Sequence, residues 1–98
     1  MAEFLVVWLD EANDELDELL DFVAERSPQA ALGIAEEISF QVGQLALFPH
    51  LGHRGRVAGT YELVVSHTPC VVVYRVAGGE VQILHMFHSR RDWPAAPR

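Results

Sequence analysis

The chain has 98 residues and a mass of 11.0 kDa, half of its residues are hydrophobic, and its formal net charge at pH 7 is −7. A chain of this length and composition folds around one core, so we expect a single domain over residues 1–98 and exclude a disordered protein. The acidic balance also disfavours binding of free nucleic acid, because neutralisation of phosphates by Lys and Arg dominates that affinity.

The charges are divided unequally along the chain. Residues 1–50 carry eleven acidic residues against Arg26 alone, whereas residues 51–98 carry six arginines against three acidic residues. The chain contains no lysine, and arginine is suited to fixed bidentate contacts with carboxylates or phosphates. We interpret the acidic half as a solvated helical surface and the basic half as the region where a partner docks.

The first predicted element is a short strand over the apolar residues 4–9, which Asp10 ends. Six apolar residues are too few for a signal-peptide core or a membrane span. The single cysteine, Cys70, lies in the most apolar run, where we expect a buried and inert thiol. One cysteine cannot form an internal disulfide, which is usual for a protein of a reducing compartment. Together with the short apolar run, this leads us to expect a cytoplasmic protein without a membrane partner.

Two helices are predicted next. Residues 11–26 form an amphipathic helix with an acidic outer face, and Ser27 followed by Pro28 is typical of the cap and first turn of a second helix. We expect this second helix to end before Pro49. Gly33 and Gly43 weaken it by about 1 kcal/mol each relative to alanine, so its stability depends on packing. The apolar positions of the two helices are Leu16, Leu19, Leu20 and Val23, then Ala31, Ile34, Ala35, Ile38, Val42 and Leu45.

The remaining elements are strands that follow a Gly- and Arg-rich loop at residues 52–59. One strand is predicted within residues 61–67 and another from Pro69 to Val76, and Gly78 with Gly79 forms a primed two-residue hairpin turn into the last strand. The order is β-α-α-β-β-β, an α+β domain in which a two-helix hairpin covers one face of an antiparallel sheet. The turn predicts the pairs Tyr74–Ile83, Val73–Leu84, Val72–His85 and Val71–Met86.

Alternation along this hairpin separates two faces of the sheet. The face with Arg75 and Gln82 is the more polar, so we assign it to the side without helices and expect the function there. On that side we expect Val71, Val73, Arg75, Gln82, Leu84, Met86 and His88, and on the helix side Val72, Tyr74, Val76, Val81, Ile83, His85 and Phe87. The five histidines show no pair with the spacing of a metal-binding helix, and we expect neither a metal nor a cofactor.

In their order and spacing, several of these segments resemble the RelE/ParE superfamily of toxins from type II toxin–antitoxin systems, and the ParE-like branch most. The segments are residues 49–52, 54–57, 59–64, 69–76 and 85–94, which read PHLG, RGRV, GTYELV, PCVVVYRV and HMFHSRRDWP. The resemblance implies the β-α-α-β-β-β fold and a cognate antitoxin that wraps the toxin. It also implies one of two activities: ParE-like members inhibit DNA gyrase, and RelE-like members cleave mRNA in the ribosome.

The two activities require different chemistry. Cleavage of mRNA needs clustered cations and a proton carrier, and RNase-type relatives place a basic residue at the strand position that Val71 occupies here. An acidic chain is also repelled by an rRNA-rich site. We therefore predict a ParE-like inhibitor that acts by binding and is not an enzyme. Two alternatives stay open: a ribosome-dependent mRNA endonuclease with His88 as general acid beside Arg91, and a non-toxic relative that only binds an antitoxin.

The predicted partner-binding residues lie in the basic half. Arg54 and Arg56 belong to the loop, and Tyr61 stands where ParE-like relatives commonly have arginine. At the C-terminal end, Arg90 and Arg91 with Trp93 combine paired cations with an aromatic ring, a combination typical of protein interfaces.

Overall fold

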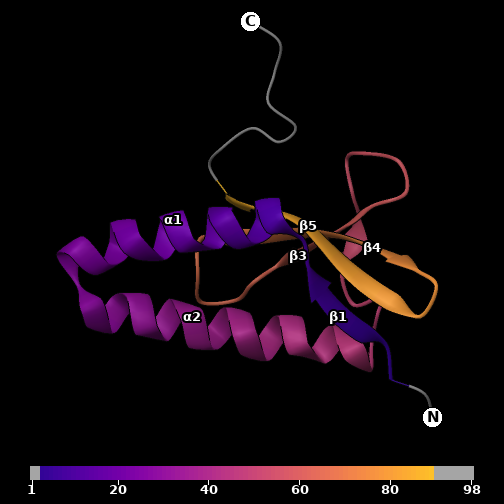
Figure 1. The fold of residues 1–98 in the computed structure, drawn as a ribbon, viewed down its shortest axis with the longest axis horizontal. Helices are drawn as coiled ribbons and strands as arrows, with labels where there is room; N and C mark the ends of the chain where they lie inside the picture. The colour runs from indigo at the N-terminus through magenta and orange to yellow at the C-terminus, as the bar shows by residue number, and fades with distance from the viewer. Residues whose placement is uncertain (1–2, 90–98) are drawn as a thin grey trace, which may run out of the picture.

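The computed structural model describes residues 3–89, and Figure 1 shows the arrangement of their helices and strands. A short strand and two helices precede a one-turn 3-10 helix and four further strands. The elements in chain order are β1 (Leu5–Trp8), α1 (Asp10–Arg26), α2 (Pro28–Gly43), the 3-10 helix η1 (Gln44–Ala46), β2 (His53–Arg54), β3 (Tyr61–Val64), β4 (Cys70–Ala77) and β5 (Glu80–His88). The α+β class and the predicted order of elements are confirmed, with the two-residue strand β2 added within the Gly- and Arg-rich loop.

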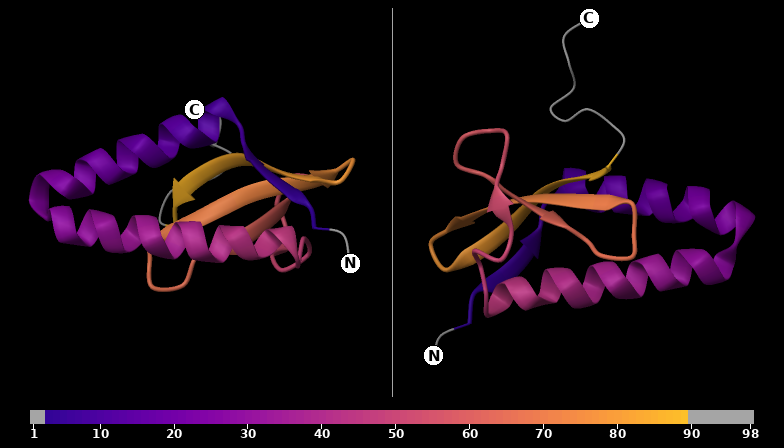
Figure 2. Two further views of the ribbon diagram at one scale, coloured as in Figure 1. Left: turned by 60° about the horizontal axis from the view of Figure 1, so that its bottom comes forward. Right: turned by 180° about the vertical axis from the view of Figure 1, so that it is seen from behind.

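The strands form one sheet in the order β1-β5-β4-β3-β2. All neighbours are antiparallel except β1, which lies parallel to β5 because the helical hairpin carries the chain back before the sheet continues. Both helices lie on one side of the sheet, as the two views of Figure 2 show. The main core fills the space between them, with Ile38, Val42 and Leu45 packed against Val72, Tyr74 and Ile83.

The helix boundaries follow local signals in the sequence. Asp10 and Glu11 occupy the first turn of α1, where carboxylates complement the helix dipole. At the start of α2 the Ser27 Oγ accepts a hydrogen bond from the Ala30 N–H at 3.1 Å, and Pro28 follows, as predicted. The second helix ends at Gly43 and η1 extends it to Ala46, so the helical segment ends before Pro49, as expected. No helix within residues 3–89 is long and apolar enough to cross a membrane.

The predicted register of the β4–β5 hairpin holds only near its turn. Gly78 and Gly79 have φ values of 57° and 80°, as a primed turn requires, and Tyr74 pairs with Ile83 as predicted. Beyond that pair a β-bulge shifts the register by one residue, so that Val73 pairs with His85, Val72 with Met86 and Val71 with Phe87. The three predicted pairs beyond Tyr74–Ile83 are therefore wrong.

The bulge changes which side chains enter the core. Met86 is 3% exposed and packs with the helix-side core, whereas Phe87 lies with Val71 and Val73 on the opposite side of the sheet. The predicted faces are thus wrong for Met86 and Phe87, and alternation then places His88 on the α1 side. The physical reason is the cost of burying an imidazole: without the extra residue, His85 and not Met86 would face the core.

His85 instead lies at the edge of β5, where β1 has ended. Its Nδ1 is 3.3 Å from the Glu15 Oε1 and 3.5 Å from the Glu11 Oε2, both on α1. The Glu15 Oε1 also accepts a hydrogen bond from the Met86 N–H at 3.1 Å. A side chain of α1 thus provides an acceptor for a backbone N–H that β1 no longer reaches. Cys70 is fully buried, as expected, and burial raises the pKa of its thiol, which makes it a poor nucleophile.

Candidate functional site

The sheet surface opposite the helices, which we call the open face, carries a second and smaller apolar cluster. Val71, Val73 and Phe87 are at most 6% exposed, and Leu84 packs against them. The cross-strand pairs Glu62–Val73 and Val64–Val71 add β3 to the same face. Val64 is 56% exposed, so the apolar surface of the cluster reaches solvent there.

An arginine and a buried carboxylate border this cluster. The Arg56 guanidinium lies 5.3 Å from the centre of the Phe87 ring, a cation–π distance. Its Nε is 3.4 Å from the Glu62 Oε1, and its backbone N–H donates to the Glu62 Oε2 at 3.0 Å. The side chain of Glu62 is 2% exposed and that of Arg56 is 51% exposed. Glu62 therefore holds both the backbone and the charge of Arg56 at the edge of the apolar surface.

The segment before this arginine is anchored to the centre of the sheet. The Gly52 N–H donates to the hydroxyl of the buried Tyr74 at 2.9 Å. Burial raises the pKa of Tyr74, and the hydrogen bond from Gly52 opposes that shift. After Gly52 the loop closes on itself, because the Gly55 N–H donates to the Thr60 carbonyl at 2.8 Å. The loop is thus held at Gly52 by Tyr74 of β4 and at Arg56 by Glu62 of β3.

Two residues predicted to bind a partner lie on the other side of this loop. Tyr61 packs on the helix-side core and stacks on Tyr74 at 5.4 Å between ring centres, with His50 tilted against it at 5.2 Å. Arg54 is exposed and pairs with Tyr61 across β2 and β3, which directs both side chains to the same side. The structure therefore places Arg56 on the open face and Arg54 on the side of Tyr61.

The candidate general acid is not on the open face. His88 is the last residue of β5 and lines a pocket with Glu15 and Glu18 of α1. Its predicted position among the open-face residues is wrong, because the bulge shifts the alternation of β5. The other predicted C-terminal residues, Arg90, Arg91 and Trp93, lie outside the described residues.

The sequence of this chain matches a known protein family over nearly its whole length. Residues 6–93 match the family model described as the ParE toxin of the type II toxin–antitoxin system parDE. The chain belongs to this toxin family.

Relatives of this ParE-family chain are similar over nearly their whole length. It is 32% identical over 94 residues to the putative toxin Y4kP of Sinorhizobium fredii, covering 96% of this chain and 97% of the relative. It is 34% identical over 87 residues to the toxin RelE2 of Caulobacter vibrioides, covering 88% of this chain and 96% of that toxin. The ParE-family match and the RelE2 likeness together place the chain in the RelE/ParE superfamily, as predicted.

Solved structures support the same assignment. A chain of the chromosomal ParDE toxin–antitoxin system from P. aeruginosa has a TM-score of 0.78 and 28% identity, covering 88% of this chain and 96% of that one. A chain of the RelBE2 toxin–antitoxin complex from Mycobacterium tuberculosis has a TM-score of 0.60 and 22% identity, covering 90% and 93%. The second likeness shows the fold alone.

Sequence reasoning missed Glu62 as a site residue of this ParE-family toxin. A signal was present: Glu62 is an acidic residue between Tyr61 and Leu63 in an otherwise apolar strand, six positions after Arg56. Such a carboxylate is buried only with partners, and an arginine in the preceding loop is the natural one.

Removing the Tyr74 hydroxyl should weaken the anchor of this loop. We expect Tyr74→Phe to lower the free energy of unfolding by about 1 kcal/mol at pH 7, because the Gly52 N–H loses its acceptor. Burial raises the pKa of Tyr74, which adds a pH dependence that the Gly52 hydrogen bond opposes: wild type, unlike Tyr74→Phe, loses stability as the pH rises above about 10, because the phenol then ionises more readily in the unfolded state than in the folded one. Urea denaturation at neutral and alkaline pH measures both effects. Tyr61→Phe is the matched control, and a Tyr74→Phe midpoint equal to wild type would contradict the role of the bond.

Proposed function

We propose that this toxin stops growth by binding DNA gyrase and that a cognate antitoxin neutralises it. The observation that carries this proposal is the exposed border of the apolar cluster on the open face: Val64 is 56% exposed next to the buried Val71, and the half-exposed Arg56 lies 5.3 Å from the centre of the Phe87 ring. An apolar surface with an arginine at its border is suited to a protein partner, since interface centres are poor in charge and enriched in aromatic residues and arginine.

The polar groups of this face also favour binding over cleavage. A ribonuclease needs cations and a proton carrier around the scissile phosphate. Within residues 3–89, Arg56 is the arginine that borders the apolar cluster. Its Nε lies 3.4 Å from the Oε1 of the buried Glu62, which neutralises much of its charge. The histidine candidate for acid catalysis, His88, lines the pocket against α1 instead. These positions leave the described part of the open face without an assembled acid–base pair.

The antitoxin is proposed from the similar proteins. The similar P. aeruginosa chain, at 28% identity, belongs to a chromosomal ParDE toxin–antitoxin system. We infer that this chain likewise pairs with an antitoxin in the cytoplasm, where gyrase is found. We expect the antitoxin to cover or neutralise the inhibitory surface. We propose that this surface includes Arg56 on the open face, Arg54 beside Tyr61 on the other side of the loop, and the C-terminal residues Arg90, Arg91 and Trp93.

A second candidate is a ribosome-dependent mRNA endonuclease. It is favoured by the position of Arg56 over Phe87, the strand partner of Val71, and by the 34% identity to the toxin RelE2. In that case Arg56 would contact a phosphate after release from Glu62, and the proton would come from His88 beside Arg91. This candidate requires toxicity to disappear with His88→Ala, whereas gyrase binding through the open face does not.

The proposal is tested by removing the paired C-terminal cations. We expect the double substitution Arg90→Ala and Arg91→Ala to abolish both growth inhibition and inhibition of gyrase supercoiling, because two arginines that anchor an interface are lost together. Far-UV circular dichroism and the thermal midpoint should stay at wild-type values. The matched control is Arg26→Ala, at the end of the acidic helix α1. Retained toxicity of the double variant would remove these residues from the inhibitory surface, and a wild-type chain without effect on growth would indicate a relative that only binds an antitoxin.

A further inference from the structure

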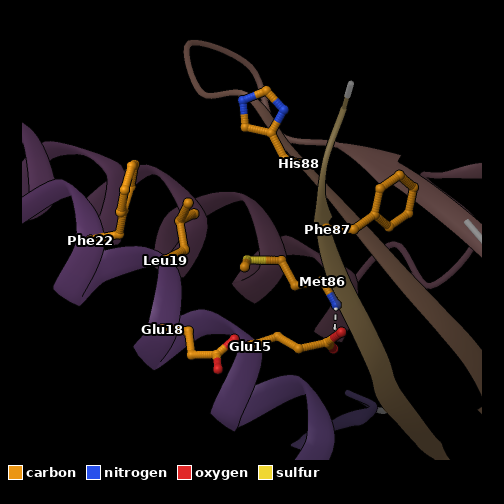
Figure 3. A pocket seen from close by; sticks show the side chains of 7 residues that line it. All are labelled: Glu15, Glu18, Leu19, Phe22, Met86, Phe87 and His88. Atoms are coloured by element: carbon orange, nitrogen blue, oxygen red, sulfur yellow. Dashed lines mark hydrogen bonds between the residues drawn. The ribbon is translucent and has the colours of Figure 1, made fainter. Parts of the chain in front are cut away.

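A pocket of about 450 Å³ lies between α1 and the end of β5. Figure 3 shows Leu19 and Phe22 of α1 on one side and Met86 of β5 on the other. Glu15, Glu18, Phe87 and His88 complete its lining. The residues lie on the side of the sheet that α1 covers, apart from Phe87, whose ring points away from the helix in Figure 3. The pocket is therefore separate from the apolar centre of the open face.

The α1 residues of the pocket form one stripe of the helix. Glu15, Glu18, Leu19 and Phe22 are spaced i, i+3, i+4 and i+7, which brings their side chains to the same helix face. The stripe combines apolar and acidic side chains, and Phe22 is 58% exposed although the Arg26 guanidinium lies 5.5 Å from the centre of its ring. A phenylalanine left half in solvent beside a pocket is typical of a surface that a partner covers.

The charges around the pocket define what it can accept. Glu15 is held by the Met86 N–H at 3.1 Å, whereas Glu18 is exposed at the rim. Helix α1 as a whole carries eight acidic residues and one basic residue, Arg26. This concentration of carboxylates attracts cations and repels nucleic acids and acidic segments. The apolar floor in turn fits a large hydrophobic side chain.

We propose that this pocket binds a cationic amphipathic segment of the antitoxin. A large apolar side chain of that segment enters the space between Leu19, Phe22 and Met86, and a flanking Arg or Lys pairs with Glu18. The inference rests on the proposed toxin–antitoxin function and adds the chemistry and the place of antitoxin recognition. The pocket then anchors one segment of the antitoxin away from the open face, while the rest of the antitoxin covers the arginine-bordered surface that contacts the target.

Two substitutions in the pocket test the proposal. The probe is the purified antitoxin whose co-expression restores growth, titrated against the full-length toxin. We expect Phe22→Ala and Glu18→Arg each to raise the dissociation constant about tenfold, as loss of a central interface contact does. We expect Glu18→Arg also to lessen the weakening of the complex by salt, because it removes an attractive charge pair. Toxicity in the absence of antitoxin should stay at the wild-type level.

Matched controls separate this pocket from general effects. Phe40→Ala removes a helical phenylalanine of α2 that is 67% exposed, and Glu25→Arg reverses an exposed charge on α1 that does not line the pocket. Both should leave the dissociation constant within about twofold of wild type. Unchanged affinity of the pocket variants, or equal losses in the controls, would overturn the proposal.

Other occupants give their own results. A concentration-dependent dimer that Phe22→Ala dissociates in analytical ultracentrifugation would assign the pocket to a second copy and overturn the proposal. A change in Trp93 fluorescence on Phe22→Ala without antitoxin, in a Trp8→Phe background, would assign the pocket to the chain's own C-terminal segment and would likewise overturn the proposal. A toxin that binds its antitoxin through the pocket but does not inhibit gyrase would refute only the proposed target.

Discussion

Replacing Glu62 with alanine should lower the free energy of unfolding by about 2 kcal/mol and abolish growth inhibition. The substitution leaves the Arg56 N–H without the acceptor that it has at 3.0 Å and removes the carboxylate that holds the guanidinium over Phe87. Because the Arg56 side chain is half exposed, water screens its charge, and we attribute most of the loss to the part-buried hydrogen bond of the Arg56 N–H. Urea denaturation and a growth assay measure the two effects.

The control for this prediction is Glu62→Gln. A glutamine oxygen can still accept from the Arg56 N–H but carries no charge, so we expect it to recover most of the stability and part of the toxicity. Glu62→Ala with wild-type stability and full toxicity would show that the Arg56–Glu62 contact does not shape the inhibitory surface.

Gly52→Ala should destabilise the fold by about 2–3 kcal/mol, since inserting a methyl group without space forces the backbone to move. A Cβ at this position would lie 2.6 Å from the Glu62 carbonyl oxygen and 2.9 Å from the Tyr74 hydroxyl. The first atom belongs to the backbone and the second to a fully buried tyrosine ring, so the loop must move away from β3 and β4 and lose the bond to Tyr74. Thermal and urea denaturation report the loss.

The matched control is Gly33→Ala in α2. A Cβ there meets nothing within 4 Å, so the substitution adds helix propensity without a clash. We expect it to stabilise the protein by up to about 1 kcal/mol. Equal effects of the two alanine substitutions would contradict the close approach of the loop to Tyr74.

Much of the fold could be predicted because its signals are local. Ser27 with Pro28 predicted the start of α2, and Gly78 with Gly79 predicted the hairpin turn, since each depends on backbone conformations that few residues adopt. The register beyond Tyr74 could not be predicted from the turn. The bulge places Met86 and not His85 in the core. This arrangement depends on α1, because Glu15 contacts both His85 and the Met86 N–H at that edge of β5.

The candidate site was less predictable, because its contacts likewise depend on tertiary packing and not on local sequence signals. Arg56 was recognised from its loop, but its place over Phe87 depends on the bulge, which brings Phe87 to the open face. Glu62 has a signal in the sequence, but its partner is fixed only when the loop folds back on β3. The pocket at Phe22 joins α1 to β5, residues that lie more than sixty positions apart, and no local pattern connects them.

We propose that this ParE-family chain inhibits growth by binding gyrase and not by cutting RNA. This proposal is tested most directly by adding the purified protein, in one experiment, to a gyrase supercoiling reaction and to translating ribosomes with a labelled mRNA. We predict that supercoiling is inhibited in proportion to toxin concentration, that added antitoxin relieves the inhibition, and that the mRNA stays intact. Ribosome-dependent cuts in the mRNA with undisturbed supercoiling would contradict the account.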